Sequence, residues 1–214
     1  MADSYTEDDF ISYCDLLAAK DNLLKQIITD YGYPPFWHRT PGYESLVRII
    51  LEQQVSLASA LACFRKLKKK VGRITPKTVL PLSDNELREC GFSRQKTQYV
   101  KNLALAIKEK KISLPKLLTK KSEDIRNELI TIKGIGHWTI DVYLLNCLHK
   151  LDIFPIGDLV LIKSLRAVGL VEKKDSKEEI LKKTEKYRPY RSILSILLWH
   201  KYINENGIDP SLLD

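Results

Sequence analysis

The stretch ITIKGIGHWTIDVYLL, residues 130–145, decides how the chain folds. Gly134 and Gly136 interrupt a helical pattern at 123–131, and apolar residues return at helical spacing directly after them, at Trp138, Val142, Leu145 and Leu148. Glycine adopts backbone angles that a side chain forbids and lets another backbone approach closely, so we expect both glycines to serve a tight turn. The stretch therefore predicts two helices joined by a short hairpin.

The rest of the chain also has the spacing of helices. Apolar residues recur at helical intervals within 7–29 and 43–64, where Gln53 is a polar break in the stripe, and further helices are expected over 94–110 and 189–205. No convincing run of alternating strand residues and no tandem repeat is present. We predict an all-α fold. Capping boxes mark two helix starts, at Ser83 with Glu86 and at Ser176 with Glu179.

The charge distribution favours a polyanionic partner. The formal net charge is +8 and the pI is near 9.2. Residues 61–111 hold 14 Lys or Arg against 4 Asp or Glu. Such a surface attracts a polyanion by releasing its counterions, which makes nucleic acid the leading partner class. The alternative is a solvated helix surface, and charge alone favours neither.

The composition excludes several other classes. No stretch approaches the roughly 18 apolar residues of a membrane span, and MADSYTEDDF at 1–10 is acidic where a signal peptide would be basic. Cys14, Cys63, Cys90 and Cys147 are dispersed, which predicts buried reduced thiols and no catalytic metal. We expect an intracellular protein without a membrane partner, located in the cytoplasm of a bacterium or the nucleus of a eukaryote.

The predicted hairpin also offers an anion site. The amides of residues 134–139, which include Gly134 and Gly136, would lie at the N-terminus of the second helix, where a phosphate oxygen can bind. Lys133, His137 and the hydroxyl of Thr139 would add to this site. The alternative is an ordinary connection between two helices without an anion site. A Gly-x-Gly motif with no other support would favour this alternative.

Four segments change that balance. They are LITIKGIGHWT (129–139), DIFPIGDLVLIKSL (152–165), YESLVRIILEQQVSLASA (43–60) and YRPYRSILSILLWHKYI (187–203). The first resembles the helix-hairpin-helix motif, the second the Pro-rich loop and aspartate of the helix-hairpin-helix DNA glycosylases, and the others the opening and closing helices of that family. The chain is most similar to the alkylbase branch, DNA-3-methyladenine glycosylase II.

This resemblance implies a monofunctional DNA glycosylase for alkylated purines of the 3-methyladenine and 7-methylguanine class. Asp158 matches the catalytic aspartate, and it is also well placed as a helix N-cap. Trp138 stands where strand-cleaving members carry a lysine nucleophile, so we expect no lyase activity. Double-stranded DNA containing damaged bases is the expected partner, the protein is expected to be a monomer, and no cofactor is required.

The same resemblance assigns a pocket for the damaged base. Trp138 and Trp199 match the family's pocket tryptophans, and their rings would attract a cationic alkylated purine by cation–π stacking. A family tyrosine falls at Val142 here. The expected substitutes are Tyr143 and the loop residues Phe36 and Trp37.

Two further DNA-related sites follow from the resemblance. Gln54 would fill the gap left by the extruded base, whereas Gln53 is expected to face inward and bond to backbone. A structural Na⁺ or K⁺ would bind the hairpin carbonyls of Ile130, Ile132 and Ile135.

The implied architecture is two helical lobes with a DNA-binding cleft between them. One lobe spans 43–150 and carries the hairpin at 130–145; the other joins 1–42 to 151–214 and carries Asp158. Two alternatives stay open. One is a glycosylase for mispaired, deaminated or oxidised bases on the same scaffold, and the other is a helix-hairpin-helix protein that binds DNA without cutting any bond.

Overall fold

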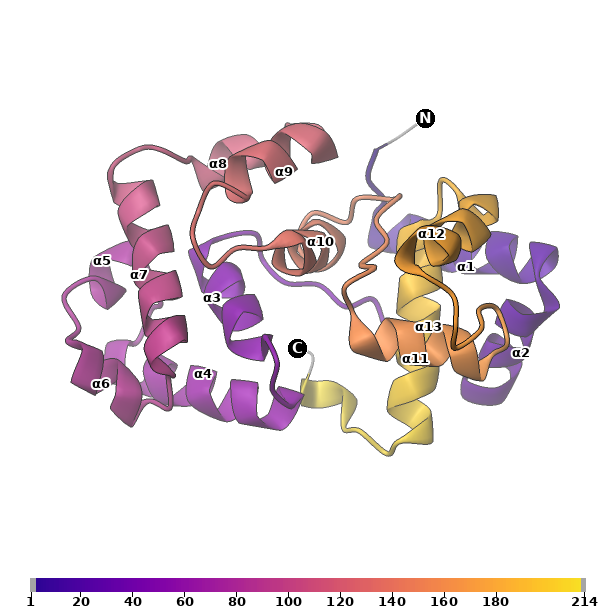
Figure 1. Cartoon of the computed structure of the whole chain (residues 1–214), viewed down its shortest axis with the longest axis horizontal. Helices are drawn as coiled ribbons and strands as arrows, with labels where there is room; N and C mark the ends of the chain where they lie inside the picture. Colours follow the sequence, from indigo (N-terminus) through magenta and orange to yellow (C-terminus); the bar gives the residue numbers. More distant parts are fainter. Residues whose placement is uncertain (1–2, 213–214) are drawn as a thin grey trace. The chain divides into compact units, whose positions relative to one another are not determined.

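The computed structural model describes residues 3–212, and within this range the regular structure is helical apart from one isolated β-bridge. The all-α prediction is confirmed for these residues (Figure 1). The α-helices are α1 (Glu7–Lys20), α2 (Asn22–Tyr31), α3 (Tyr43–Glu52), α4 (Leu57–Val71), α5 (Pro76–Val79), α6 (Asp84–Glu89), α7 (Arg94–Lys108), α8 (Leu114–Leu117), α9 (Ser122–Leu129), α10 (His137–Asn146), α11 (Leu159–Ala167), α12 (Lys177–Thr184) and α13 (Arg191–Glu205), with 3₁₀ turns at Glu185–Tyr187 and Pro210–Leu212.

The described chain forms two compact units. Unit 1 comprises residues 3–38 and 144–212, and unit 2 comprises residues 39–143. Unit 1 is therefore built from two separate stretches of chain, whereas unit 2 is continuous. The lobe boundaries expected from the sequence follow residues 42 and 150, whereas the boundaries of the observed units follow residues 38 and 143.

The centre of unit 2 is formed by α3 and α7. Helix α3 packs against α4 and α7, and α5 and α6 pack against α7. Nearly every residue of α3 is buried, as expected for a helix with neighbours on most sides. The hydroxyl of Tyr43 donates to the carbonyl of Val100 at 3.0 Å, which ties the start of α3 to α7.

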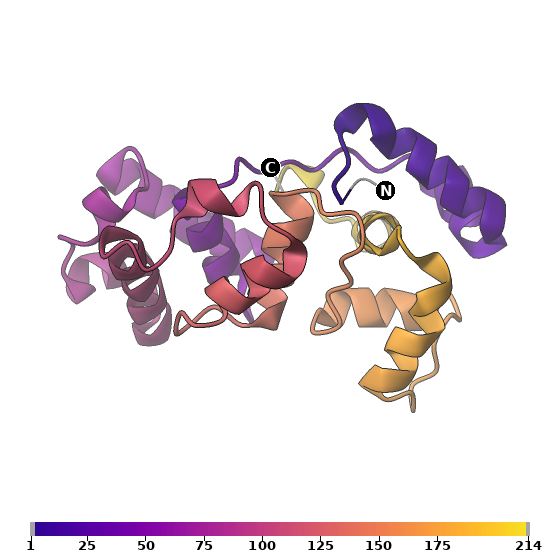
Figure 2. The ribbon, with the colours of Figure 1, turned by 90° about the horizontal axis from the view of Figure 1, so that it is seen from above.

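The central helix of unit 1 is α13. It packs against α1, α2 and α11, and Figure 2 shows it between the α1–α2 pair and the α11–α12 pair. All residues from Arg191 to Leu198 are buried. The helix that carries Trp199 is therefore held by neighbours on several sides.

Two stretches expected to be single helices are each split. The stretch 7–29 breaks at Asp21, whose carboxylate caps α2 and also accepts a hydrogen bond from the hydroxyl of Tyr187 at 2.6 Å. The stretch 43–64 breaks at the turn 53–56. Hydrophobic spacing continues across each break because the helices before and after it face the same core. Both expected capping boxes are confirmed, at Ser83 with Glu86 and at Ser176 with Glu179.

All four cysteines are buried and free, as predicted. Burial raises the pKa of Cys14 to about 12 and that of Cys63 to about 11, so both are protonated thiols at neutral pH. Among residues 3–212, no helix combines the length and apolar character that crossing a membrane requires.

The N-terminal residues of unit 1 pair with the segment that follows α10. Ser4 forms an antiparallel bridge with Lys150, and the N–H of Tyr5 donates to the carbonyl of His149 at 3.0 Å. The two separate stretches of unit 1 are thus joined by backbone hydrogen bonds as well as by helix packing.

His149 is a buried titratable group at this junction. Its Nε2 lies 2.9 Å from Nδ1 of His38, and the ring of Phe36 stacks on it with centroids 4.6 Å apart. Burial and the neighbouring His38 lower the pKa of His149 to about 4. The imidazole of His149 is therefore neutral in the folded protein at neutral pH.

We expect the free energy of unfolding to fall as the pH is lowered from about 6.5 to about 4. Over this range the unfolded chain, with an ordinary histidine pKa, takes up a proton that the folded chain does not. Since His38 is exposed and solvent screens the pair, the expected loss is roughly 1 to 2 kcal/mol. Denaturant unfolding at about pH 7.0 and about pH 4.5 measures this loss in the free energy of unfolding.

His149→Asn is the matched variant, because asparagine tolerates the left-handed φ of 46° found at this position. The variant should lose this part of the pH dependence and keep the part that comes from carboxylates. Equal pH dependence of the two proteins would contradict the prediction.

Candidate functional site

The predicted helical hairpin is present in unit 2. Helix α9 ends at Leu129 and α10 begins at His137. A hydrogen bond at the start of α10 runs from the N–H of Ile140 to the carbonyl of Gly136 at 3.1 Å. The helix itself provides no acceptor for the amides of its first turn, such as that of His137. Gly136 and His137 are exposed, so this end of α10 is accessible to an anion.

The two hairpin glycines have different roles. Gly134 has a φ of 106°, and a Cβ there would lie 2.1 Å from Cγ of Tyr99, on α7. A Cβ at Gly136 would meet no heavy atom of the described residues within 4 Å, and its φ is outside the left-handed region. The expectation that both glycines are needed for the turn is correct for Gly134 and wrong for Gly136. No local pattern in the sequence marks Tyr99 as a hairpin contact.

Gln53 fastens the turn after α3 to the hairpin. Its Nε2 donates to the carbonyl of Gly134 at 3.0 Å and to Oγ1 of Thr139 at 2.9 Å. The prediction that Gln53 faces inward and bonds to backbone is confirmed. The prediction that the Thr139 hydroxyl contributes to a phosphate site is wrong, because that side chain is 1% exposed and its oxygen is bonded to Gln53.

The remaining candidates of the phosphate site are accessible. Lys133 and His137 are exposed, and Lys133 is held through its carbonyl, which accepts from Nδ2 of Asn102 at 3.2 Å. The ammonium group of Lys133 is therefore carried on a fixed backbone. The anion site that the geometry supports consists of Lys133, His137 and the amides of the turn.

Gln54 lies at the tip of the turn between α3 and α4. Its side chain is exposed, and its backbone has a φ of 56°, in the left-handed region that residues other than glycine seldom adopt. The next residue, Val55, is also exposed. The turn therefore presents Gln54 to solvent, as a residue that inserts into DNA requires.

Asp158 caps α11, as the sequence predicts. Its Oδ1 accepts from the N–H of Leu161 at 2.8 Å and from Nε1 of Trp199 at 3.4 Å. Its own N–H donates to the carbonyl of Pro155 at 2.8 Å, which closes the Pro-rich loop before it. The carboxylate is half-buried and is oriented by a main-chain amide and an indole that reach the same oxygen.

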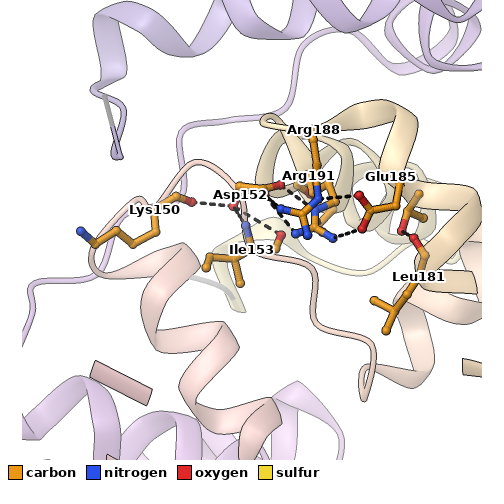
Figure 3. A network of polar contacts seen from close by, with 10 residues as sticks. Lys150, Asp152, Ile153, Leu181, Glu185, Arg188 and Arg191 are labelled. Carbon is orange, nitrogen blue, oxygen red and sulfur yellow. Dashed lines mark hydrogen bonds and ion pairs between the residues drawn. The ribbon is translucent and has the colours of Figure 1, made fainter. Parts of the chain in front are cut away.

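The segment before Asp158 is anchored to α13 by a polar network (Figure 3). Asp152 accepts from Nε and Nη2 of the buried Arg191 at 2.6 and 3.0 Å. Oγ of Ser192 accepts from the N–H of Ile153 at 3.0 Å. Asp152 and Arg191 both lie in family-like segments, but they are 39 residues apart and neither segment indicates that the two side chains pair.

The aromatic candidates divide into accessible and buried side chains. Trp138 and Trp199 are half-buried and retain surface that a ligand can contact. Tyr143 is 0% exposed and ranks among the largest fully buried side chains, so the role of pocket substitute is wrong for it. Trp37 is 7% exposed, and its ring centroid lies 6.4 Å from that of His200. A base would therefore find little surface of Trp37 to stack on. Phe36 packs on His149 within unit 1.

The cation site expected at the hairpin carbonyls stays a prediction. The carbonyl of Ile132 accepts from the N–H of Ile135 at 3.0 Å, which leaves its second lone pair for another partner. Within residues 3–212, no group of three or more His, Cys, Asp or Glu is placed to hold a metal ion. A cation here would therefore rely on main-chain oxygens such as those of Ile130 and Ile135.

Acidic neighbours partly neutralise the basic region 61–111. Lys68 pairs with Glu44 at 2.7 Å, and Lys101 pairs with Asp84 at 2.6 Å. The positive charge that this region offers a polyanion is therefore smaller than its composition indicates. Exposed basic residues also lie along it, at Arg65, Lys66, Lys69, Arg73, Lys77, Arg88, Arg94, Lys108 and Lys110.

The sequence profile of the HhH-GPD superfamily base excision DNA repair proteins matches residues 47–189. The chain belongs to the HhH-GPD superfamily. The matched range includes the hairpin, Gln54 and Asp158, whereas Trp199 lies beyond it. The resemblance inferred from four sequence segments is thereby confirmed at the level of the family.

This HhH-GPD protein is similar to two proteins of Schizosaccharomyces pombe. It is 32% identical over 191 residues to the alkylbase DNA glycosidase-like protein mag2, covering 86% of this chain and 89% of the relative. It is 30% identical over 180 residues to DNA-3-methyladenine glycosylase 1, covering 82% and 79%. Among solved structures, the S. pombe 3-methyladenine DNA glycosylase in complex with abasic DNA superposes with a TM-score of 0.80 at 26% identity, covering 91% of this chain and 97% of that one.

Proposed function

We propose that this HhH-GPD protein is a DNA glycosylase that removes alkylated purines from double-stranded DNA and leaves an abasic site. The observation that carries the proposal is Asp158, a carboxylate fixed at the N-terminus of α11 and bonded to the indole of Trp199. The names of the relatives support the substrate class, since both refer to alkylbase or 3-methyladenine glycosylases.

The carboxylate of Asp158 supplies the chemistry that breaking a base–sugar bond requires. As the bond lengthens, positive oxocarbenium character develops on the deoxyribose, and a preorganised negative charge stabilises it. The same carboxylate can instead orient the attacking water. In both cases its fixed orientation matters, because a group that need not reorganise during the reaction lowers the barrier most.

The tryptophans give a basis for selecting the damaged base. A 3-methyladenine or 7-methylguanine base is cationic in DNA, so it is a good leaving group and is attracted to indole faces of the kind that Trp138 and Trp199 each offer. A neutral mispaired or oxidised base would need hydrogen bonds to its edges instead. Alkylated purines are therefore the substrates that these residue types fit best.

Trp199→Phe should lower the single-turnover rate constant for base release by about 10-fold, because it removes the indole N–H that orients Asp158. The control is Trp138→Phe, which reduces an aromatic surface of the same kind and leaves the Asp158 contact intact. Affinity for abasic DNA, measured by fluorescence anisotropy, should be unchanged in Trp199→Phe. An equal fall in rate for the two variants would assign Trp199 to stacking alone.

The hairpin and Gln54 complete the proposed action on DNA. Lys133, His137 and the turn amides bind a phosphate of the lesion strand, and Gln54 occupies the gap left by the extruded base. A Na⁺ or K⁺ held by the carbonyls of Ile130, Ile132 and Ile135 would add positive charge beside that phosphate. Replacing both cations by tetramethylammonium at constant ionic strength should then weaken DNA binding.

The proposed enzyme has no lyase activity and acts as a monomer. Trp138 offers no amine at the position where strand-cleaving members carry lysine, so the phosphodiester next to the abasic site should stay intact until alkali is added. Sedimentation velocity should give the mass of one chain, 24.7 kDa.

The test of the function is release of 3-methyladenine and 7-methylguanine from methylated duplex DNA. Wild-type protein should release one or both, and the product should be cut by alkali but not by the protein. Single-lesion duplexes carrying uracil, a G·T mispair or 8-oxoguanine form the comparison panel. Release of a neutral base in preference to the methylated purines would contradict the proposed substrate class.

A further inference from the structure

We propose that Gln53 is a positioning residue that locks the turn 53–56 to the hairpin, so that phosphate binding and extrusion of the base act through one rigid body. We call the turn 53–56 the insertion turn. The inference rests on the proposed function and adds a residue that does not itself contact the reacting atoms.

A single side-chain amide, that of Gln53, donates two hydrogen bonds to the hairpin. The Nε2 group of Gln53 donates to the carbonyl of Gly134, at the left-handed position of the hairpin, and to Oγ1 of Thr139, in the first turn of α10. Both protons of the amide are therefore engaged, and the bonds span 81 and 86 residues of sequence. The partners lie on either side of the proposed phosphate site.

The end of α3 is fastened independently of Gln53. Glu52 accepts two hydrogen bonds from Arg39, at 2.8 and 3.0 Å, and both side chains are largely buried. Lys96 donates from Nζ to the carbonyl of Leu51 at 2.7 Å. The insertion turn therefore begins from a fixed helix end, and Gln53 fixes the turn itself.

The backbone conformation of Gln54 depends on this fastening. Gln54 has a φ of 56°, which costs a residue with a side chain about 1 kcal/mol or more, and such conformations persist where the surroundings hold them. Gln54 is exposed, so burial of its side chain does not hold this conformation. The bonds of Gln53 are the contacts nearest to Gln54 that can maintain its orientation.

The consequence concerns the extrusion step. Turning a base out of the duplex costs a few kcal/mol, and the inserted side chain must stay in the gap while the hairpin holds the phosphate backbone. If the insertion turn moved relative to the hairpin, the inserted residue would leave the gap and the base would return to the stack. The Gln53 bonds prevent that movement.

The test compares a lesion in intact duplex with the same lesion in a form that needs little extrusion. Gln53→Met removes both N–H donors and keeps the length of the side chain. For a duplex containing one 7-methylguanine, the single-turnover release rate should fall about 10-fold, the equivalent of two weakened hydrogen bonds. For the same strand without its complement, the rate should change less than about 2-fold, because the base is already unstacked.

Two further variants make the result specific. Gln98→Met, the same substitution at an exposed position of α7, should leave both rates unchanged. Thr139→Val removes one of the two acceptors and keeps the shape of the buried side chain, so it should lower the duplex rate by about 3-fold. This milder variant also covers the case in which Gln53→Met does not fold.

A fluorescence measurement that does not depend on base release separates this inference from the proposed function. A duplex with 2-aminopurine next to the lesion becomes brighter when the neighbouring base is extruded on binding. Gln53→Met should reduce that increase at saturating protein, while its affinity for undamaged duplex stays within about 2-fold of wild type. If wild-type protein releases no base, the proposed function fails and this measurement still tests Gln53. Equal rate losses on duplex and single strand, or an unchanged fluorescence increase, would overturn the inference.

Discussion

Asp158→Asn should lower the single-turnover rate constant for 3-methyladenine release by two to three orders of magnitude, roughly the loss seen when one preorganised transition-state contact is removed. The substitution replaces a negative charge by a neutral amide of the same shape. The oxocarbenium character that develops on the sugar then loses its counter-charge, whether the carboxylate acts on the sugar directly or on the water.

The fold should tolerate this substitution. Asparagine is as good an N-cap as aspartate, so its Oδ1 can still accept from the N–H of Leu161 and from the indole of Trp199. The melting temperature and the affinity for abasic DNA should therefore stay close to those of wild type. A fall of less than about 10-fold would remove Asp158 from the catalytic role, since one ordinary hydrogen bond could account for it.

The matched control is Asp8→Asn. Asp8 is an exposed carboxylate in the first turn of α1, in the same unit as Asp158, and its position near a helix N-terminus gives it a comparable local field. Its replacement changes the net charge by the same amount. If Asp8→Asn lowered base release as much as Asp158→Asn does, the effect would come from overall charge.

Gly134→Ala should destabilise the protein by about 3 kcal/mol, because the new methyl group meets the ring of Tyr99 at a backbone angle that alanine avoids. For a chain of this size that loss corresponds to a melting temperature lower by roughly 6 to 12 °C. The clash involves Cβ, Cγ and Cδ1 of Tyr99, and rotation of the ring cannot relieve it fully because Cβ is fixed to the backbone of α7. Thermal unfolding followed by circular dichroism measures the shift.

Gly136→Ala provides the control at the neighbouring glycine. A methyl group there has open space around it, so the melting temperature should change by less than about 2 °C. The same methyl group would stand where a phosphate is proposed to approach, so DNA affinity should fall. Tyr99→Ala combined with Gly134→Ala should cost less than the sum of the single changes, since the clash is shared. Additive losses would show that Tyr99 is not the cause.

The sequence sufficed for features that depend on neighbouring residues. The hairpin, the capping boxes and the N-cap at Asp158 each follow from a motif of fewer than about a dozen residues, with its own backbone requirement. The inward orientation of Gln53 was also predictable, because a single polar residue on an apolar stripe must find an internal partner.

The features that the sequence could not supply depend on which distant side chains meet. Periodicity places Thr139 and Tyr143 on α10 but does not say which faces of that helix are covered, and both proved to be buried. The helix break at Asp21 was missed because its carboxylate is held by Tyr187, 166 residues away. Gly134 and Gly136 look alike in the sequence, yet only Gly134 has to be glycine, because a Cβ there would meet the side chain of Tyr99.

The discontinuity of unit 1 has a consequence for how the chain is made. Residues 3–38 leave the ribosome before their partner α13, which follows only after all of 39–143 has been synthesised, a delay of roughly 5 to 20 s at common translation rates. The continuous unit can complete its core during that interval. The α1–α2 pair must wait with the face that packs on α13 uncovered, and such transiently exposed apolar surface is prone to aggregation.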